Sequence, residues 1–260
     1  MRNHKKWITF IAVFLLILSM TACGSGKEEE TYHISQMVQE MSDGSVTRTE
    51  YRYTEDWATE EVLTYQNEQM MTRMYYTFGE DGKPETMSIT DGNTTESVDL
   101  FFTYDEEGRV LSQTHSMNGQ VQYYSEVTYD DKGNILTQYT EQPTYGNSLQ
   151  ITYTYDESGN QTEMRTLLNG IHLTRKVTEY DASGHITVET EYQGEDQISA
   201  VSNHSYDAET RTDTALTYDA YGNEGGKIIT SYDEAGNEIM KEYYMNNTLT
   251  VRMTMTYVKG

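Results

Sequence analysis

A short pattern that starts with Thr-Tyr-Asp and reaches a Gly three residues after the Asp recurs through most of the chain. Clear copies begin at Thr103, Thr128 and Thr154, and further copies centre on Tyr180 and Tyr232. With the weaker copies included, the aromatic anchors fall at positions 53, 78, 104, 129, 155, 180, 206, 232 and 257, so every gap is 25 or 26 residues. A fixed period in this range indicates a repeat architecture, in which each unit buries its face against its neighbours.

The repeat is long enough for two strands and two turns, but too short for a β-α-β unit, which needs about 30 or more residues. The Asp and Gly of the pattern suit a tight turn, since Asp bonds the backbone two residues on and Gly accepts a positive φ. A second turn is expected half a period later, where Asn118-Gly119, Asn169-Gly170 and Asn246-Asn247 stand. The sequence therefore predicts about 17 strands of about 8 residues, joined as hairpins.

The strands that lead into the Tyr-Asp turns alternate between two kinds of residue. Tyr155, Tyr153 and Ile151 fall on one face, and Thr154 and Thr152 on the other. Period-two alternation is typical of a half-buried antiparallel strand. We therefore expect the Tyr side to face inward and the Thr side to face solvent.

The fold class predicted is all-β, a long antiparallel meander of repeated β-hairpins. A flat sheet of this many strands would be about 80 Å wide, and sheets of that width usually curl, because strand twist accumulates. We expect a strongly twisted or rolled sheet, with a single-layer sheet as the alternative. Residues 32–41 fit a first strand and also show helical spacing at Ile34, Met37, Val38 and Met41, and we favour the strand.

The N-terminus carries the features of a bacterial lipoprotein signal. Arg2, Lys5 and Lys6 precede a 14-residue apolar run over 7–20, which is too short to span a bilayer as a helix. The run ends in Met20-Thr21-Ala22-Cys23, which places small residues before the only cysteine of the chain. We predict a signal peptide over 1–22, lipidation of Cys23, a flexible tether over 23–30 and a repeat domain over 31–260. A simple secretory signal, or an uncleaved anchor, is the alternative.

The segments around Tyr104 and Tyr129, which read Tyr-Asp-x-x-Gly-(Asn/Arg)-(Ile/Val)-Leu, resemble the YD-repeat (RHS-type) family of bacterial surface and secreted proteins. With degenerate copies, the resemblance covers the chain from about residue 50 onward. It implies hairpins in a long sheet that spirals into a shell, and in some large members that shell encloses a C-terminal toxin. This chain ends on the anchor Tyr257, which leaves no room for a toxin, and has no self-cleavage motif, so the resemblance implies the architecture and says little about activity.

The charge of the chain restricts its partners. The formal net charge is −24, so phosphate groups repel the protein, and we expect no nucleic-acid partner and no contact of the domain with anionic lipid. The predicted lipid would hold the protein on the extracytoplasmic face of the cell membrane. A glycan or a surface protein remains as the expected partner.

Catalytic and metal motifs do not stand out from the repeats. The acidic turns, such as Asp105-Glu106-Glu107, each offer two or three oxygen ligands, whereas Ca²⁺ needs six or more, so ordinary solvated turns are favoured. The histidines are scattered, without a His-Glu-x-x-His motif, and neither a Gly-x-Ser-x-Gly elbow nor a phosphate loop is present. We therefore predict neither a catalytic site nor a cofactor nor a metal.

Four aromatic residues depart from the register of the anchors. The ladder of anchor tyrosines is expected to form the buried face, whereas Tyr75, Phe101, Tyr124 and Tyr244 fall on the Thr side. These four are the candidate ligand-facing residues. The favoured function is a non-catalytic binding or adhesion module. The alternatives are a structural spacer without a ligand and, further off, a secreted hydrolase or a toxin-accessory protein.

Overall fold

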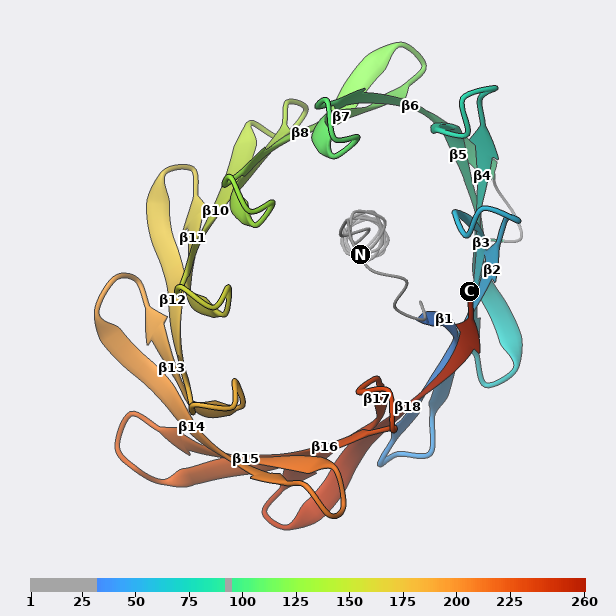
Figure 1. The fold of residues 1–260 in the computed structure, drawn as a ribbon. Coiled ribbons are helices and arrows are strands. Elements are labelled where there is room, and N and C mark those ends of the chain that lie inside the picture. Colours follow the sequence, from blue (N-terminus) through green and yellow to red (C-terminus); the bar gives the residue numbers. More distant parts are fainter. Residues whose placement is uncertain (1–31, 92–94) are drawn as a thin grey trace.

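The computed structural model describes residues 32–91 and 95–260, and in these ranges every regular element is a β-strand. Eighteen strands follow one another as antiparallel hairpins (Figure 1). Their bounds are β1 Tyr32–Met41, β2 Val46–Tyr53, β3 Thr59–Gln66, β4 Gln69–Phe78, β5 Pro84–Thr90, β6 Thr95–Tyr104, β7 Val110–Met117, β8 Gln120–Tyr129, β9 Ile135–Gln142, β10 Asn147–Tyr155, β11 Gln161–Leu168, β12 Ile171–Tyr180, β13 Ile186–Gln193, β14 Gln197–Asp207, β15 Thr212–Asp219, β16 Glu224–Tyr232, β17 Glu238–Met245 and β18 Thr248–Lys259. The predicted meander is confirmed.

The sheet closes on itself, which the sequence did not predict. Strand β1 pairs with β2 on one side and with β18 on the other, from Tyr32 opposite Lys259 to Met41 opposite Val251. The strongly twisted or rolled sheet that the sequence predicts is in fact a closed β-barrel, and its wall is a single layer of strands. Accumulated strand twist explains the closure, since it brings the two edges of a long meander together and lets their backbone groups pair.

The two faces of the sheet become the inner and outer walls of the ring. The residues in register with the anchor tyrosines, such as Tyr76, Leu100 and Val127, are buried, whereas residues of the opposite register, such as Tyr75 and Phe101, are exposed. Side chains converge on the concave wall and diverge on the convex wall, so the anchor register marks the inner wall. On the outer wall, hydroxyl pairs join neighbouring strands at Thr77–Thr86, Thr103–Ser112 and Thr128–Thr137. The expected orientation, with Tyr inward and Thr outward, is confirmed.

One end of the ring, which we call the turn rim, is formed by the eight connections from β2–β3 to β16–β17, which carry most of the Asp turns; the Asp219 turn, between β15 and β16, lies at the other end. In the turn after β8, Asp130 N–H donates to the Asn134 carbonyl at 2.9 Å, and its carboxylate accepts bonds from the Lys132 and Asn134 backbone. Gly133 takes the positive φ that closes the turn. The hydroxyl of the anchor Tyr129 donates to the carbonyl of Val110, and Tyr53, Tyr155, Tyr180 and Tyr257 make the equivalent bond. At these five positions the anchor thus links the end of its strand to the strand beside it.

The other end of the ring, which we call the flared rim, is formed by the described connections β1–β2, β3–β4, β7–β8, β9–β10, β11–β12, β13–β14, β15–β16 and β17–β18. In Figure 1 the connections of the turn rim lie toward the inside of the ring, whereas the hairpin ends of the flared rim lie outside it. The two ends of the ring therefore differ in width. Because Tyr32 pairs with Lys259, both ends of the described chain lie at the turn rim.

The inner wall is apolar along one arc. Val62, Met74, Tyr76, Met87, Val98 and Leu100 form one buried cluster across β3 to β6, which we call the apolar arc. Tyr76 and Met87 are directly paired and are each 1% exposed. Burial of side chains of this size contributes about 1.5–3 kcal/mol each.

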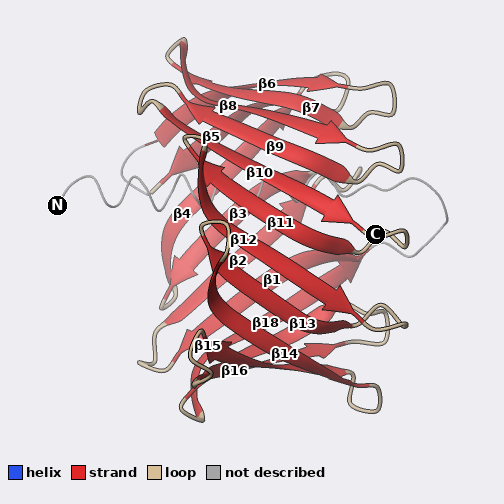
Figure 2. Cartoon of the chain, turned by 90° about the vertical axis from the view of Figure 1, so that its left-hand side faces the viewer, coloured by secondary structure: helices blue, strands red, loops and turns tan. Residues whose placement is uncertain are grey.

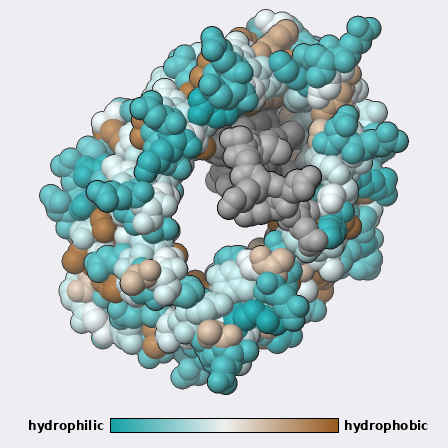
Figure 3. Space-filling model, viewed as in Figure 1, coloured by the Kyte–Doolittle hydropathy of each residue, from teal (hydrophilic) through white to brown (hydrophobic). Residues whose placement is uncertain are grey.

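Figure 2 views the ring from the side and shows the strands crossing it obliquely. In the end view of Figure 3 the surface is mainly hydrophilic, with apolar patches scattered over it, and an opening passes through the ring. No helix in the described ranges is long and apolar enough to cross a membrane.

Candidate binding surfaces of the ring

Two of the four predicted ligand-facing aromatics come together on the outer wall. Phe101 of β6 lies opposite Thr114 of β7, and Thr114 lies opposite Tyr124 of β8. Two strand spacings separate the rings by about 10 Å. Phe101 is 60% exposed. We call Phe101, Thr114 and Tyr124 the aromatic row.

Carboxylates border the aromatic row. Tyr124 lies opposite Glu141 of β9, and its hydroxyl donates to Glu126, two residues further along β8. This hydrogen bond raises the pKa of the Tyr124 hydroxyl, because ionisation would place a second negative charge beside Glu126. The row thus combines exposed aromatic carbon with hydroxyl and carboxylate oxygens.

The other two predicted aromatics, Tyr75 and Tyr244, do not join the row. Tyr75 of β4 lies on the same wall, with the Arg73 guanidinium 5.9 Å from its ring centre. Tyr244 of β17 lies on a distant part of the ring, where its hydroxyl donates to Glu242 at 3.0 Å and Lys227 Nζ lies 4.5 Å from its ring centre. Each of these rings already has a cation against it.

The inner wall also holds a charged cluster that sequence reasoning missed. Lys176, Glu189, His204 and Asp213 stand on the consecutive strands β12 to β15, and we call this region the charged arc. His204 Nδ1 lies 2.8 Å from an Asp213 oxygen, and Lys176 Nζ lies 2.7 Å from Glu189. His204 Nε2 lies 3.5 Å from Glu189, an ion-pair distance that exceeds a normal hydrogen bond. The sequence does contain a signal for this cluster. When the strands are paired in order, all four residues fall in the anchor register.

The charged arc holds its histidine as a cation. The hydrogen bond to Asp213, with Glu189 on the other side, raises the pKa of His204 to about 9. In turn, His204 and Lys176 lower the pKa of Glu189 to about 2. A histidine that is already protonated at neutral pH cannot accept a proton from a substrate, so this arrangement stabilises charge rather than serving as a general base.

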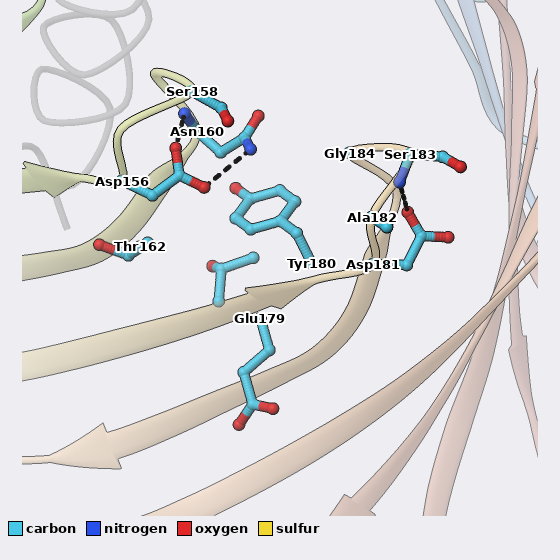
Figure 4. A pocket seen from close by; sticks show the side chains of 11 residues that line it. Asp156, Ser158, Asn160, Thr162, Glu179, Tyr180, Asp181, Ala182, Ser183 and Gly184 are labelled. Carbon is cyan, nitrogen blue, oxygen red and sulfur yellow. Dashed lines mark hydrogen bonds between the residues drawn. The ribbon is translucent and has the colours of Figure 1, made fainter.

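A polar groove of about 580 Å³ lies between two neighbouring Asp turns at the turn rim (Figure 4). The ring of Tyr180 lies between the turn of Asp156 and the turn of Asp181. Both oxygens of Asp156 are occupied, one by Asn160 N–H at 2.8 Å and the other by the Asn160 amide at 2.9 Å. Because the turn uses these oxygens itself, we interpret the groove as a product of turn geometry.

The acidic residues of the other turns are used in the same way. Hydrogen bonds from the turn lower the pKa of Asp130, chiefly from the Asn134 side chain, and of Asp233, chiefly from the Asn237 side chain. Within the described residues, no group of three or more His, Cys, Asp or Glu side chains could hold a metal ion. Cys23, the predicted lipidation site, lies outside the described residues.

Comparison with known proteins gives only distant similarities. No protein-family model matches the chain, and no curated protein matches it. A porin-like protein from Bacteroides uniformis has a TM-score of 0.47 at 10% identity, over 87% of this chain and 98% of that one. A porin-like protein from Bacteroides vulgatus has a TM-score of 0.41 at 11% identity, over 88% of this chain and 99% of that one.

Tc toxin structures are also similar, more weakly. The TcdB2-TccC3-Cdc42 structure matches with a TM-score of 0.30 at 11% identity, over 82% of this chain. The Photorhabdus luminescens Tc holotoxin pore matches with a TM-score of 0.28 at 11% identity, over 79% of this chain. The chain spans only 15% and 16% of those toxin chains. At these scores the likenesses carry no argument about function.

Proposed function

We propose that this protein is a non-catalytic binding module of the bacterial surface, and that it binds a glycan through the aromatic row. The observation that carries the proposal is the alignment of Phe101 and Tyr124 in one row of the outer wall. A pyranose ring presents apolar C–H faces that stack on aromatic rings, and hydroxyls that bond to carboxylates. Phe101 and Tyr124 offer the first kind of contact, while Glu126 and Glu141 offer the second.

The outer wall supports a position in water. Its ionised side chains stand in mid-strand, where Glu163 bonds Arg165 and Arg175, and Glu242 bonds Arg252 at 2.7 Å. Charged groups of this kind are costly against lipid and ordinary against solvent. The wall that carries the aromatic row is therefore suited to an aqueous ligand.

The proposal includes anchoring by lipid on the extracytoplasmic face, which rests on the sequence around Cys23. The test is Cys23→Ser, with cell fractionation and labelling by a fatty-acid analogue. Loss of the label together with accumulation of the unprocessed precursor supports lipidation. If the variant is processed normally and stays in the membrane fraction, the anchor is of another kind.

We also propose that the chain is a YD-repeat protein. The support is that the Tyr-Asp turns share one construction, since the Asp-to-Gly turn bond and the positive-φ Gly recur after β6, β8, β10, β12 and β16. The Tyr hydroxyl bond to the neighbouring strand recurs as well. The repeated sequence pattern therefore corresponds to a repeated structural unit and not only to a shared composition.

Glycan binding is tested by an array screen of the purified full chain, followed by calorimetry with each ligand found. Phe101→Ala and Tyr124→Ala are expected to weaken binding about tenfold or more, because each removes a stacking surface. Tyr192→Ala is the matched control, since Tyr192 is an outer-wall tyrosine far from the row, with Arg175 4.7 Å from its ring centre. Equal loss in all three variants would contradict the proposal.

A structural spacer is the second candidate. The observation that favours it is that the Tyr124 hydroxyl is already bound to Glu126, as the Tyr244 hydroxyl is to Glu242. A spacer would show no ligand on the array and no shift in melting temperature with any glycan. Binding of a surface protein, with Phe101 and Tyr124 required, would keep the row as the site and change the class of ligand.

A further inference from the structure

The exposed apolar residues of the ring gather at one end. Of the eighteen large apolar residues described as exposed, eleven lie in or within three residues of a flared-rim connection, and four in or within three residues of a turn-rim connection. Eight different hairpins of the flared rim contribute at least one, among them those of Met70, Tyr145, Ile171, Ile198, Tyr221 and Met245. Tyr221 is 91% exposed and Ile171 is 73% exposed.

Exposed apolar surface on this scale is unusual for a face that meets only water. The exposed fractions amount to on the order of 1,000 Å² of surface, whereas a standard protein interface buries about 800 Å² per partner. The flared rim therefore offers enough surface for a stable contact.

The two rims also differ in charge. The connections of the turn rim contain fifteen acidic and four basic residues, and the described connections of the flared rim contain four acidic residues and no Lys or Arg. An anionic lipid surface attracts basic residues, which the flared connections lack, so a membrane is a poor occupant. The acidic turn rim, by contrast, is repelled by any other copy of itself.

We infer that the flared rim is an interface for a second copy of this chain, with the two flared rims facing each other. In this arrangement the apolar hairpin ends bury one another and the acidic turn rims stand furthest apart. The two ends of the ring differ in width (Figure 1), so a flared rim matches another flared rim and does not match a turn rim. Such a contact is isologous and closes at two copies.

The position of the chain ends determines how the pair would stand relative to a membrane. Tyr32 and Lys259 pair at the turn rim, so the first described residue of each ring lies at the end away from the interface. Two copies joined by their flared rims therefore place their Tyr32 residues at opposite ends of the pair. Because Tyr32 follows the predicted anchor at Cys23 by only nine residues of sequence, copies anchored in two facing membranes can meet in this way more readily than copies in one membrane.

The test uses the full chain held in lipid nanodiscs by its N-terminal segment, at one copy per disc. Sedimentation velocity is expected to show two-disc particles that increase with protein concentration. Salt should strengthen the pairing, because it screens the acidic residues and leaves apolar contacts in place. Empty nanodiscs should not be captured, and capture of empty discs would mean that the rim binds lipid.

The decisive variant combines Ile171→Ser with Tyr221→Ser. It is expected to raise the dissociation constant of the pair about tenfold or more, since two of the most exposed apolar side chains are removed. The matched control combines Tyr75→Ser with Leu136→Ser, which are exposed by 39% and 37% but lie away from the flared rim. Circular dichroism verifies that both variants keep the sheet.

Three outcomes would overturn the inference. These are discs that stay single at every concentration, pairing that survives Ile171→Ser with Tyr221→Ser, and equal loss in the control. The proposed glycan site is independent, because Phe101 and Tyr124 are untouched in the rim variant. A rim variant that loses pairing and keeps glycan binding separates the two ideas.

Discussion

Two histidines on the inner wall have very different surroundings, although both lie in strands of the same repeat pattern. His115 lies in β7, paired with Leu100 of the apolar arc, and burial lowers its pKa to about 4. His204 lies in β14 between Asp213 and Glu189, which raise its pKa to about 9. Both side chains are nearly buried and both belong to the anchor register. The surrounding side chains therefore decide whether the imidazole is neutral or protonated.

The comparison extends to equivalent pairs of residues. Tyr76 and Met87 face each other across β4 and β5, and Thr178 and Glu189 occupy the same places in the repeat across β12 and β13. The backbone pairing is the same, yet one arc relies on apolar contact and the other on ion pairs. The repeat therefore fixes where a side chain points and leaves its chemistry free. Five predictions test this contrast, from the largest expected effect to the smallest.

The apolar arc should be the more sensitive of the two. Tyr76→Ala is expected to lower the free energy of unfolding by about 3–5 kcal/mol, because it leaves a cavity in the buried cluster. The measurement is urea denaturation of the purified protein. Tyr75→Ala, on the outer wall, is the control and should cost less than about 1 kcal/mol. Similar costs for both would show that the inner wall is not the packed one.

The charged arc should respond to loss of its central cation. His204→Gln is expected to cost about 2 kcal/mol, because Asp213 and Glu189 then lose their shared positive partner. His185→Gln is the control, since this exposed histidine lies 3.3 Å from the Asp181 carboxylate and stacks on Tyr206 at 4.2 Å, and it should change stability by less than about 1 kcal/mol. A neutral result for His204→Gln would mean that the arc is not held by charge.

Alkali should weaken the charged arc. The pKa of His204 is raised in the folded state, so its contribution is complete below the unfolded value near 6.5 and is lost as pH rises through about 9. Denaturation at pH 6, 8 and 10 should show the difference between wild type and His204→Gln shrinking toward zero. A difference that stays constant over this range would contradict the assignment.

Acid should weaken the apolar arc. The pKa of His115 is lowered in the folded state, so the unfolded chain binds the proton more readily, and stability falls as pH drops from about 6.5 toward 4. The expected loss is about 2 kcal/mol, discounted for relaxation around the charged ring. His115→Gln replaces the imidazole with a side chain that does not titrate. This variant should not show the fall in stability between about pH 6.5 and pH 4, whatever the substitution itself costs in stability.

The turns should be the least sensitive. Gly133 has a φ of +90°, so Gly133→Ala is expected to cost about 1 kcal/mol through strain. Gly225→Ala is the control, since Gly225 has no positive φ and an added Cβ would meet only the Thr217 carbonyl, at 3.6 Å. Both are measured by thermal denaturation. Equal effects would show that turn conformation does not limit stability.

Much of this architecture can be read from the chain, because period and alternation are local signals. The hairpins and the two walls follow from the spacing of Tyr104, Tyr129 and Tyr155, and the outward position of Phe101 and Tyr124 follows from the same register. Closure could not be read in this way, because β1 lacks the Tyr-Asp pattern and its pairing with β18 shifts register near Ser35. The charged arc was missed because its members come from four strands and meet only when pairing is known.

Closure also sets an order of events for the growing chain. Strand β1 is made first, but one of its two partners, β18, is made last, and the Thr256 hydroxyl reaches the Gln36 carbonyl across 220 residues of sequence. During synthesis, β1 therefore has one unpaired edge until β18 has been made. An unpaired edge is a site for wrong strand partners, and contacts so distant in sequence form slowly. The chain is thus most vulnerable to misassembly just before its last strand arrives.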